Sequence, residues 1–540
     1  MNIKYIIDND KYTIKKKSDD FNFILTNSFG DFFSLQSGLN VFNKNSKKLI
    51  EIIKKINTHN KQISEVLNYG YKILRIFDDG STDEFFMAPK GGLIYNMNGF
   101  DDKISIELNL KKAIFTEVEN IEFIETLVND FILGIKTINS KIIKRGNVVD
   151  ILPEQKSSVI IEYGFSKEEI FDKINLLEKH SSDLQMIQSE IFMDLINKTS
   201  FKKPISDSVR FAYNFSKYNL YGFLNRANES NIGIFTDFEN NLSIFSYEEL
   251  ISLRGLIDSN DNDYVKNKIY CYLELIEEKL NLTNSKKYEN ELFNLDLLFL
   301  FVKRFEDFIF HLVEKNNLHK YFSSGELDLL QKKLSFIFGK VIELNWNEKS
   351  ELITENKKCS LIHQVGLLEF SSFLNNFCEL LQVESKMNLK KFETLLRSKI
   401  GSTFLKNNIL YDDENNKDET TNTFLSYYLY PSLFTKDVWV NIFSRSLNIL
   451  EDEDENIKNS KNGDSVFWIN NLIIICLNDL HKENYEEFIS KYILKSTNII
   501  LDSFTIGYAT EFLSSDNQKI NITGISTYIE MINKMFTLFK

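Results

Sequence analysis

The feature that most constrains the fold is a change of pattern at about residue 165. Before it, apolar residues alternate along short segments that end in turn residues, as in residues 71–77 (YKILRIF), which precede DDGS. After it, apolar residues such as Ile170 and Ile174 recur at helical spacing behind the sequence Ser166-Lys167-Glu168-Glu169, which is typical of a helix start. The chain therefore divides into a strand-rich first part and a helical second part.

The first part, residues 1–165, reads as a β-sandwich domain. Many short strands without long helices between them are typical of that architecture. A single helix is predicted within it, at residues 46–56. The predicted strands are residues 21–26, 71–77, 84–87, 104–110, 131–135 and 158–163.

The second part, residues 166–540, is predicted to be almost entirely helical. The whole chain has 4 Pro and 20 Gly, and so few breakers favour long helices. About a dozen helices in one block indicate an α/α toroid or a helical-repeat solenoid, and no repeat of fixed period supports the solenoid. The predicted class is therefore α+β, an N-terminal β-sandwich followed by an (α/α)6-type toroid. The predicted helices after the first are residues 209–226, 247–257, 263–280, 290–316, 325–344, 359–382, 390–400, 436–450, 464–481, 485–502 and 527–538.

Charge and cysteine content narrow the classes of partner. The net charge is −13 at pH 7, which argues against a nucleic-acid partner and is compatible with a neutral substrate. The four cysteines, Cys271, Cys359, Cys378 and Cys476, form no C-x-x-C pair, so no disulfide framework is expected and a reducing cytoplasm is the predicted location. The six histidines lack metal-binding spacing, and no apolar run is long enough to span a membrane.

Three segments carry a resemblance to a known family: residues 23–35 (FILTNSFGDFFSL), 245–256 (FSYEELISLRGL) and 463–472 (GDSVFWINNL). In this order along the chain, they resemble segments of the amylo-α-1,6-glucosidase family of archaeal glycogen-debranching proteins. The first resembles the strand and turn that open the family's N-terminal sandwich, and the other two are similar to family helix starts that face the sugar. The resemblance implies hydrolysis of α-1,6-linked glucose in a glycogen-like glucan, with inversion of configuration and without a cofactor.

The resemblance also implies catalytic positions. Residues 506–515 (IGYATEFLSS) are similar to the family segment that supplies the general base, and Glu511 falls on its carboxylate. Residues 360–363 (SLIH) stand where the family has its general-acid Asp, so His363 is the nearest counterpart of that acid. In an inverting glycosidase the acid protonates the leaving oxygen while the base activates water. Because an imidazolium does not reproduce a neutral carboxylic acid, loss of the Asp implies slow turnover at most.

Further residues are implied in substrate binding. Glu248 replaces a family Asp that faces the sugar, and Asp296 lies in residues 293–301 (FNLDLLFLF), which resemble another family helix start. Glu369 lies in residues 367–373 (LLEFSSF), which match the helix after the acid. Asp464 and Trp468 belong to the 463–472 segment, where the Trp offers a flat face for a pyranose.

Three functions remain open from the sequence. The chain is a glycoside hydrolase of the amylo-α-1,6-glucosidase type, or a catalytically impaired relative that binds glucan or a partner protein, or a helical scaffold without a sugar site. The first requires a second carboxyl group that faces Glu511. The sequence leaves the oligomeric state open.

Overall fold

The protein divides into two compact units. The first comprises Met1–Ile244, Leu494–Thr510 and Gln518–Ile522, and the second Phe245–Ile493, Glu511–Asn517 and Thr523–Lys540. The change from strand to helix falls at residues 164–167, where the sequence predicts it. The domain limits 1–165 and 166–540 stay a prediction. The computed structural model describes residues 6–8, 13–16, 21–27, 30–43, 48–58, 61–89, 91–109, 113–126, 131–197, 201–224, 234–235, 242–243, 246–283, 294–355, 358–385, 387–413, 419–453, 456–460, 463–503, 505–513 and 519–536.

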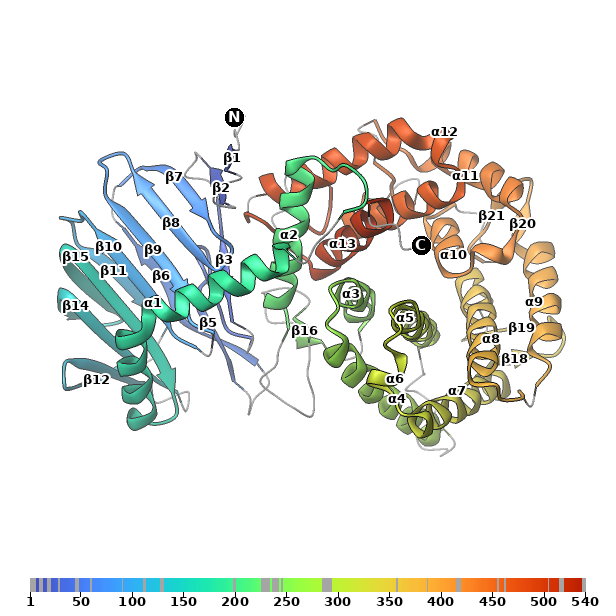
Figure 1. Ribbon diagram of the computed structural model, residues 1–540, viewed down its shortest axis with the longest axis horizontal. Helices are drawn as coiled ribbons and strands as arrows, with labels where there is room; N and C mark the ends of the chain where they lie inside the picture. Colours follow the sequence, from blue (N-terminus) through green and yellow to red (C-terminus); the bar gives the residue numbers. More distant parts are fainter. Residues whose placement is uncertain are drawn as a thin grey trace. The chain divides into compact units, whose positions relative to one another are not determined.

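An antiparallel network of 15 strands dominates the described residues of the first unit (Figure 1). Its strands are β1 (Ile6–Asp8), β2 (Thr13–Lys16), β3 (Ile24–Thr26), β4 (Phe32–Ser34), β5 (Gly38–Asn43), β6 (Lys48–Asn57), β7 (Ile63–Asn68), β8 (Lys72–Phe77), β9 (Thr82–Met87), β10 (Leu93–Asn98), β11 (Ile104–Leu108), β12 (Ala113–Val118), β13 (Ile121–Thr126), β14 (Ile132–Arg145) and β15 (Val148–Gly164).

The long β14–β15 hairpin joins two sheets. The end of β15 pairs with β10 and its beginning with β11, while β14 runs beside both halves. The register shifts between Ile138 and Ser140, opposite Pro153, so the hairpin bends where it passes from one sheet to the other. The two sheets meet through Phe85 of β9, whose ring centroid lies 5.6 Å from that of Phe23 and 5.1 Å from that of Phe33. The predicted sandwich is therefore confirmed.

The predicted helix at residues 46–56 is wrong, because β6 occupies residues 48–57. Its buried residues, Leu49, Ile52, Ile53 and Ile56, have helical spacing. In the sheet, Ile53 pairs with Leu39 while Glu51 pairs with the next residue, so β6 carries a bulge at residue 52. A bulge reverses the alternation of faces and thus imitates a helical pattern.

Helix α1 (Lys167–Asn197) packs on one sheet of the sandwich. Its Ile170, Ile174 and Leu177 share a buried cluster with residues of β9, β10, β13 and β15. The predicted helix start is present: the Glu169 amide donates to Ser166 Oγ (3.1 Å), and the Glu169 carboxylate accepts from the Phe165 amide (3.2 Å). The cluster buries apolar surface between α1 and the sheet, and this burial is the main source of stability of their packing.

The described residues of the second unit are mainly helical, as predicted. The sequence missed α10, whose eight residues give too short a pattern, and divided α12 into two helices. The helices after α1 are α2 (Asp207–Gly222, in the first unit), α3 (Tyr247–Asp258), α4 (Asn262–Thr283), α5 (Leu295–Glu314), α6 (Leu318–Tyr321), α7 (Ser324–Asn345), α8 (Leu361–Leu381), α9 (Leu389–Phe404), α10 (Asn422–Leu429), the 3₁₀ turn η1 (Pro431–Leu433), α11 (Lys436–Leu450), α12 (Phe467–Asp502) and α13 (Ile522–Phe536).

Between helices, the described part of the chain contains three pairs of two-residue strands: β16–β17 (Ile234–Phe235 and Leu242–Ser243), β18–β19 (Trp346–Asn347 and Leu352–Ile353) and β20–β21 (Leu405–Lys406 and Ile409–Leu410).

Helices α3, α5, α8, α10, α12 and α13 form an inner layer of the second unit. In α3, α5 and α12, residues near the beginning of the helix line one cavity and later residues line a second. These three helices therefore run in the same direction past the two cavities. Helices α4, α7, α9 and α11 each connect two inner helices along the chain (Figure 1).

Close approach of α5 and α8 depends on Gly366. A Cβ atom at this position would lie 2.4 Å from Cγ of Phe299, whose ring is buried. Side chains in a packed core move at a cost, so Gly366→Ala is expected to lower the free energy of unfolding by about 1–3 kcal/mol.

Gly339 in α7 provides the matched control. A Cβ there meets nothing within 4 Å, so Gly339→Ala is expected to raise the free energy of unfolding by about 0.5–1 kcal/mol, as in an ordinary helix interior. Urea unfolding of both variants measures the difference. Changes of the same sign and size would contradict the packing role of Gly366.

Candidate active site

The beginnings of the inner helices bring several predicted site residues together. Asp296 lies in the first turn of α5 and His363 in the first turn of α8. The Nε2 atom of His363 lies 3.0 Å from a carboxylate oxygen of Asp296 and 3.7 Å from one of Glu355. The His363 side chain is buried, whereas that of Asp296 is 46% exposed. Asp296 is thus the member of the pair that solvent or a ligand reaches.

The free nitrogen of His363 is not available to a ligand. Its Nδ1 is buried and has no hydrogen-bond partner among the described residues. In the tautomer with the proton on Nε2, Nε2 donates to Asp296 and the buried Nδ1 carries no N–H group that would lack an acceptor. Burial therefore favours this tautomer. A ligand therefore meets the pair through the carboxyl group of Asp296, which His363 orients by this hydrogen bond.

An aromatic pair lies beside these carboxylates. The rings of Tyr247 in α3 and Trp468 in α12 meet edge to face, with centroids 5.9 Å apart. Burial raises the pKa of Tyr247 to about 12, and the carboxylate of Asp296 adds to the effect. Its hydroxyl therefore stays a hydrogen-bond donor at neutral pH.

These residues line a small cavity of about 40 Å³, which we call the N-terminal cavity after the N-terminal ends of the inner helices. Its lining includes Tyr247, Asp296, Ile362, Leu425 and Trp468, together with Arg304 and Tyr428. Ligand sites commonly measure about 300–1,000 Å³, so this space holds water but no sugar ring without side-chain movement.

Glu511 lies after α12 in the chain, and its backbone runs beside the first residue of that helix. Its carbonyl oxygen accepts a hydrogen bond from the Phe467 amide (3.0 Å), and Phe512 pairs with Val466. Trp468 follows Phe467 directly, so the backbone of Glu511 is fixed close to the residue that lines the N-terminal cavity.

The other predicted binding residues lie in different settings. Glu248 is half-buried in the first turn of α3, where its carbonyl oxygen accepts from Ser252 Oγ (2.7 Å). Asp464 is exposed just before α12, and its carbonyl oxygen accepts from the Asn459 amide (2.9 Å). Each is near the beginning of an inner helix, but neither lines the N-terminal cavity.

Glu369 lies away from His363, Asp296 and the N-terminal cavity. It lies six residues after His363 in α8, about 9 Å further along the helix axis. There it is buried and pairs with Nζ of Lys303 at 3.0 Å. Burial raises the pKa of the Glu369 carboxyl, against the effect of the neighbouring ammonium group. Its surroundings are those of a buried ion pair.

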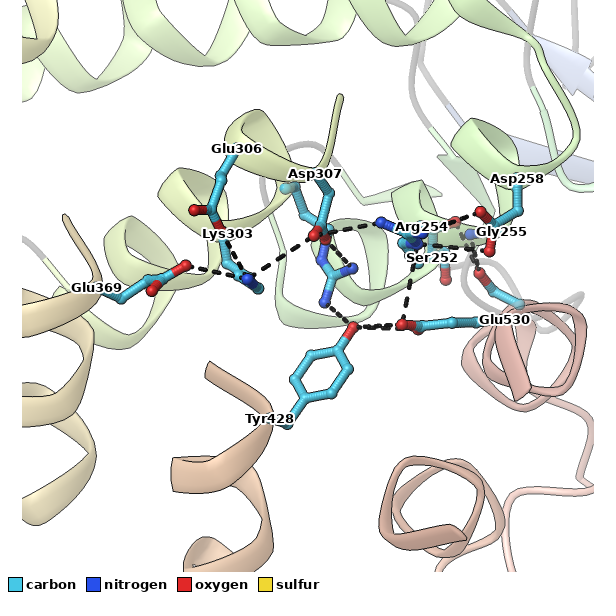
Figure 2. A network of polar contacts seen from close by, with 12 residues as sticks. Ser252, Arg254, Gly255, Asp258, Lys303, Glu306, Asp307, Glu369, Tyr428 and Glu530 are labelled. Atoms are coloured by element: carbon cyan, nitrogen blue, oxygen red, sulfur yellow. Dashed lines mark hydrogen bonds and ion pairs between the residues drawn. The ribbon is translucent and has the colours of Figure 1, made fainter. Parts of the chain in front are cut away.

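Figure 2 shows a network of charged residues. It adjoins the N-terminal cavity, because its members Arg304 and Tyr428 also line that cavity. The guanidinium of Arg304, 1% exposed, donates to Asp307 (2.7 Å) and to the Tyr428 hydroxyl (2.7 Å). The Tyr428 hydroxyl donates in turn to Glu530 (2.9 Å). Arg254 pairs with Asp258 at 3.1 Å and with Asp307 at 3.2 Å.

Asp307 is the centre of that network. Burial alone would raise its pKa, but Arg254, Arg304 and Lys303 lower it to about 2. For Glu530 the balance is reversed: burial raises the pKa, and Arg254 and Arg304 do not fully offset it. The network thus contains carboxyl groups with opposite pKa shifts, which is common at functional sites and in structural ion-pair networks.

Beyond the network, a second cavity of about 560 Å³ lies among later residues of the inner helices. We call it the C-terminal cavity. Residues of α3, α5, α10, α12 and α13 line it, including Arg254, Lys303, Asp307, Tyr428 and Glu530. Its volume is within the range of ligand sites.

Sequence reasoning missed the network and the C-terminal cavity. Arg254 stands within residues 245–256, which resemble the family, and Glu530 lies in the last predicted helix, residues 527–538. Their charges on apolar helices were the available signal. Arg304 and Tyr428 are 124 residues apart, and nothing local in the sequence indicates their contact.

Comparison with known proteins identifies the fold. No family model matches the chain, and neither does any curated protein. The structure of a bacterial glucoamylase complexed with acarbose aligns with a TM-score of 0.62 at 9% sequence identity, over 96% of this chain and 94% of that chain. A wild-type glycosidase aligns with a TM-score of 0.45 at 8% identity, over 62% of this chain and 99% of that one.

The chain therefore has the glucoamylase fold, a β-rich N-terminal part followed by an (α/α)6 toroid, and the predicted fold class is confirmed. Within the described part of the chain, no group of three or more His, Cys, Asp or Glu side chains is arranged to hold a metal ion. Across the same residues, no helix is long and apolar enough to cross a membrane.

Proposed function

We propose that the protein is a glycoside hydrolase that acts on α-glucan at the N-terminal cavity. The observation that carries this proposal is the contact of Asp296 with His363 at the beginnings of two inner helices of a glucoamylase fold. The substrate is an α-1,6-linked glucose at a branch point of a glycogen-like glucan, as the family resemblance implies. The four cysteines are all free thiols, in keeping with action in the cytoplasm.

The proposed mechanism uses inversion. Asp296 in its acid form gives its carboxyl proton to the glycosidic oxygen, whose bond to the anomeric carbon breaks. The carboxylate that remains accepts a hydrogen bond from Nε2 of His363. Glu511 takes a proton from a water molecule, and the water oxygen bonds to the opposite face of that carbon. Acid and base carboxyl groups in inverting enzymes lie about 6.5–9.5 Å apart, which leaves room for this water. Trp468 offers a flat apolar face to the sugar ring.

A second candidate is a glucan-binding protein with little turnover. Two observations favour it: His363 stands in place of the family's general-acid Asp, and the N-terminal cavity measures about 40 Å³. Acid–base assistance is worth about 10²–10⁴-fold per group, so a weakened acid lowers the rate without abolishing binding.

Glucose release from a phosphorylase limit dextrin tests the proposal. The wild-type protein is expected to release free glucose, and Asp296→Asn is expected to lower that rate by about 10²-fold or more because the amide has no acidic proton. Asp328→Asn, an exposed change on α7, is the control and should match the wild type.

Affinity electrophoresis in glycogen-containing gels separates the candidates. Retardation without glucose release supports the binding protein and rejects the hydrolase. Absence of both retardation and glucose release rejects both candidates.

A further inference from the structure

The C-terminal cavity has the electrostatic character of a cation site. Among the described residues, six carboxylates line it, against the three positive side chains of Arg254, Lys303 and Lys534. His311, which also lines it, is uncharged at neutral pH because burial lowers its pKa to about 4. The carboxylates are those of Asp258, Glu306, Asp307, Glu314, Asp479 and Glu530.

The backbone adds to this negative potential. Helix α3 ends at Asp258 and α5 at Glu314, and both residues line the cavity. The carboxyl end of a helix carries a partial negative charge of roughly half an electron, which attracts cations. Anionic ligands are therefore disfavoured here by both side chains and helix ends.

Two of the positive side chains that line the cavity, those of Arg254 and Lys303, already form ion pairs within the protein. Arg254 pairs with Asp258 and Asp307, and Lys303 pairs with Glu306 and Glu369. No ion pair within the described residues involves Glu314 or Asp479. Asp479 accepts one hydrogen bond, from the Tyr427 hydroxyl at 2.8 Å, and keeps further acceptor capacity.

The cavity also offers apolar surface. Phe310, Tyr427 and Pro431 line it beside the carboxylates. Aromatic faces attract ammonium and guanidinium groups in addition to burying a carbon chain. The volume of about 560 Å³ suits a small organic molecule. Among the described residues, no group of three or more His, Cys, Asp or Glu side chains is arranged to hold a metal ion.

We propose that the C-terminal cavity binds a small organic cation, a linear amine or guanidine whose charged groups pair with Asp479 and Glu314 and whose chain lies on the aromatic wall. This site is separate from the N-terminal cavity and does not depend on the proposed hydrolase activity. The Arg304–Tyr428 contact lies between the two cavities, because Tyr428 lines both.

Isothermal titration calorimetry with spermidine and putrescine tests the site. Putrescine is compared with 1,4-butanediol, which has the same chain length without charge. We expect one saturable site for each amine, and no heat of binding for the diol or for inorganic phosphate. Binding of the diol as well as the amine, or of phosphate, would overturn the proposal.

Two charge-reversed variants separate the cavity from the general acidity of the protein. Asp479→Lys places an ammonium group at the exposed edge of the cavity and should raise the amine Kd by about tenfold or more. Glu487→Lys makes the same charge change on the same helix, at a side chain that is 85% exposed and outside the cavity. Its Kd should stay within about twofold of the wild type. Equal weakening in both variants would show non-specific attraction and overturn the site.

Discussion

Replacing Glu511 by Gln is expected to lower kcat for glucose release by about 10²–10⁴-fold. The amide has nearly the same shape but cannot accept a proton from water. The structure gives Glu511 a second, purely backbone role, since its carbonyl oxygen caps the amide of Phe467. That hydrogen bond persists in Glu511→Gln, so the thermal midpoint should stay close to the wild-type value while activity is lost.

A chemical rescue distinguishes a base from a positioning residue. Azide is already an anion and needs no deprotonation, so it should restore bond cleavage in Glu511→Gln and yield a glucosyl azide of inverted configuration. It should not rescue Asp296→Asn, because that variant lacks the proton for the leaving oxygen. An unchanged rate in Glu511→Gln, or loss of activity together with the thermal midpoint, would remove Glu511 from the mechanism.

The sequence predicted the two-part fold because both parts have clear periodicity. The β8–β9 hairpin was readable from two alternating segments around a DDGS turn. The bulge in β6 could not be predicted from the sequence, because one extra residue changes which side chains face the core. The length of α12 was also misjudged, because residues 481–487 are polar and interrupt its apolar pattern.

The predicted site residues differ in how well local sequence locates them. Asp296, His363 and Trp468 each lie in the first turn of an inner helix, and helices that run in one direction bring their first turns together. Glu369 is on the same helix as His363 but almost two turns further along it. It therefore forms an ion pair with Lys303 and does not reach the residues around His363. The small volume of the N-terminal cavity depends on how side chains from five helices pack, and no single segment determines that.

The charged network should make stability depend on acid pH through Asp307. Its folded-state pKa is lowered from 3.8 to about 2. A carboxyl group with a lowered pKa contributes its stability above the unfolded value and loses it as pH falls through the folded value. The contribution, about 2 kcal/mol, should therefore be present at pH 5 and disappear between about pH 4 and pH 2. In Asp307→Asn, the free energy of unfolding should fall less steeply over that interval.

Removal of the whole side chain should have a larger effect. Asp307→Ala leaves Arg254 and Arg304 buried without the carboxylate that they share, at 3.2 and 2.7 Å. Breaking a buried pair in this way costs about 3–5 kcal/mol, because the remaining charges stay desolvated. Glu343→Ala removes an exposed ion pair with Lys340 (2.8 Å) and should change stability by about 0.5 kcal/mol or less. Urea unfolding at pH 7 compares the two. A small loss in Asp307→Ala would mean that water or Glu530 replaces the missing carboxylate, and that the network is not what holds α3, α5 and α13 together.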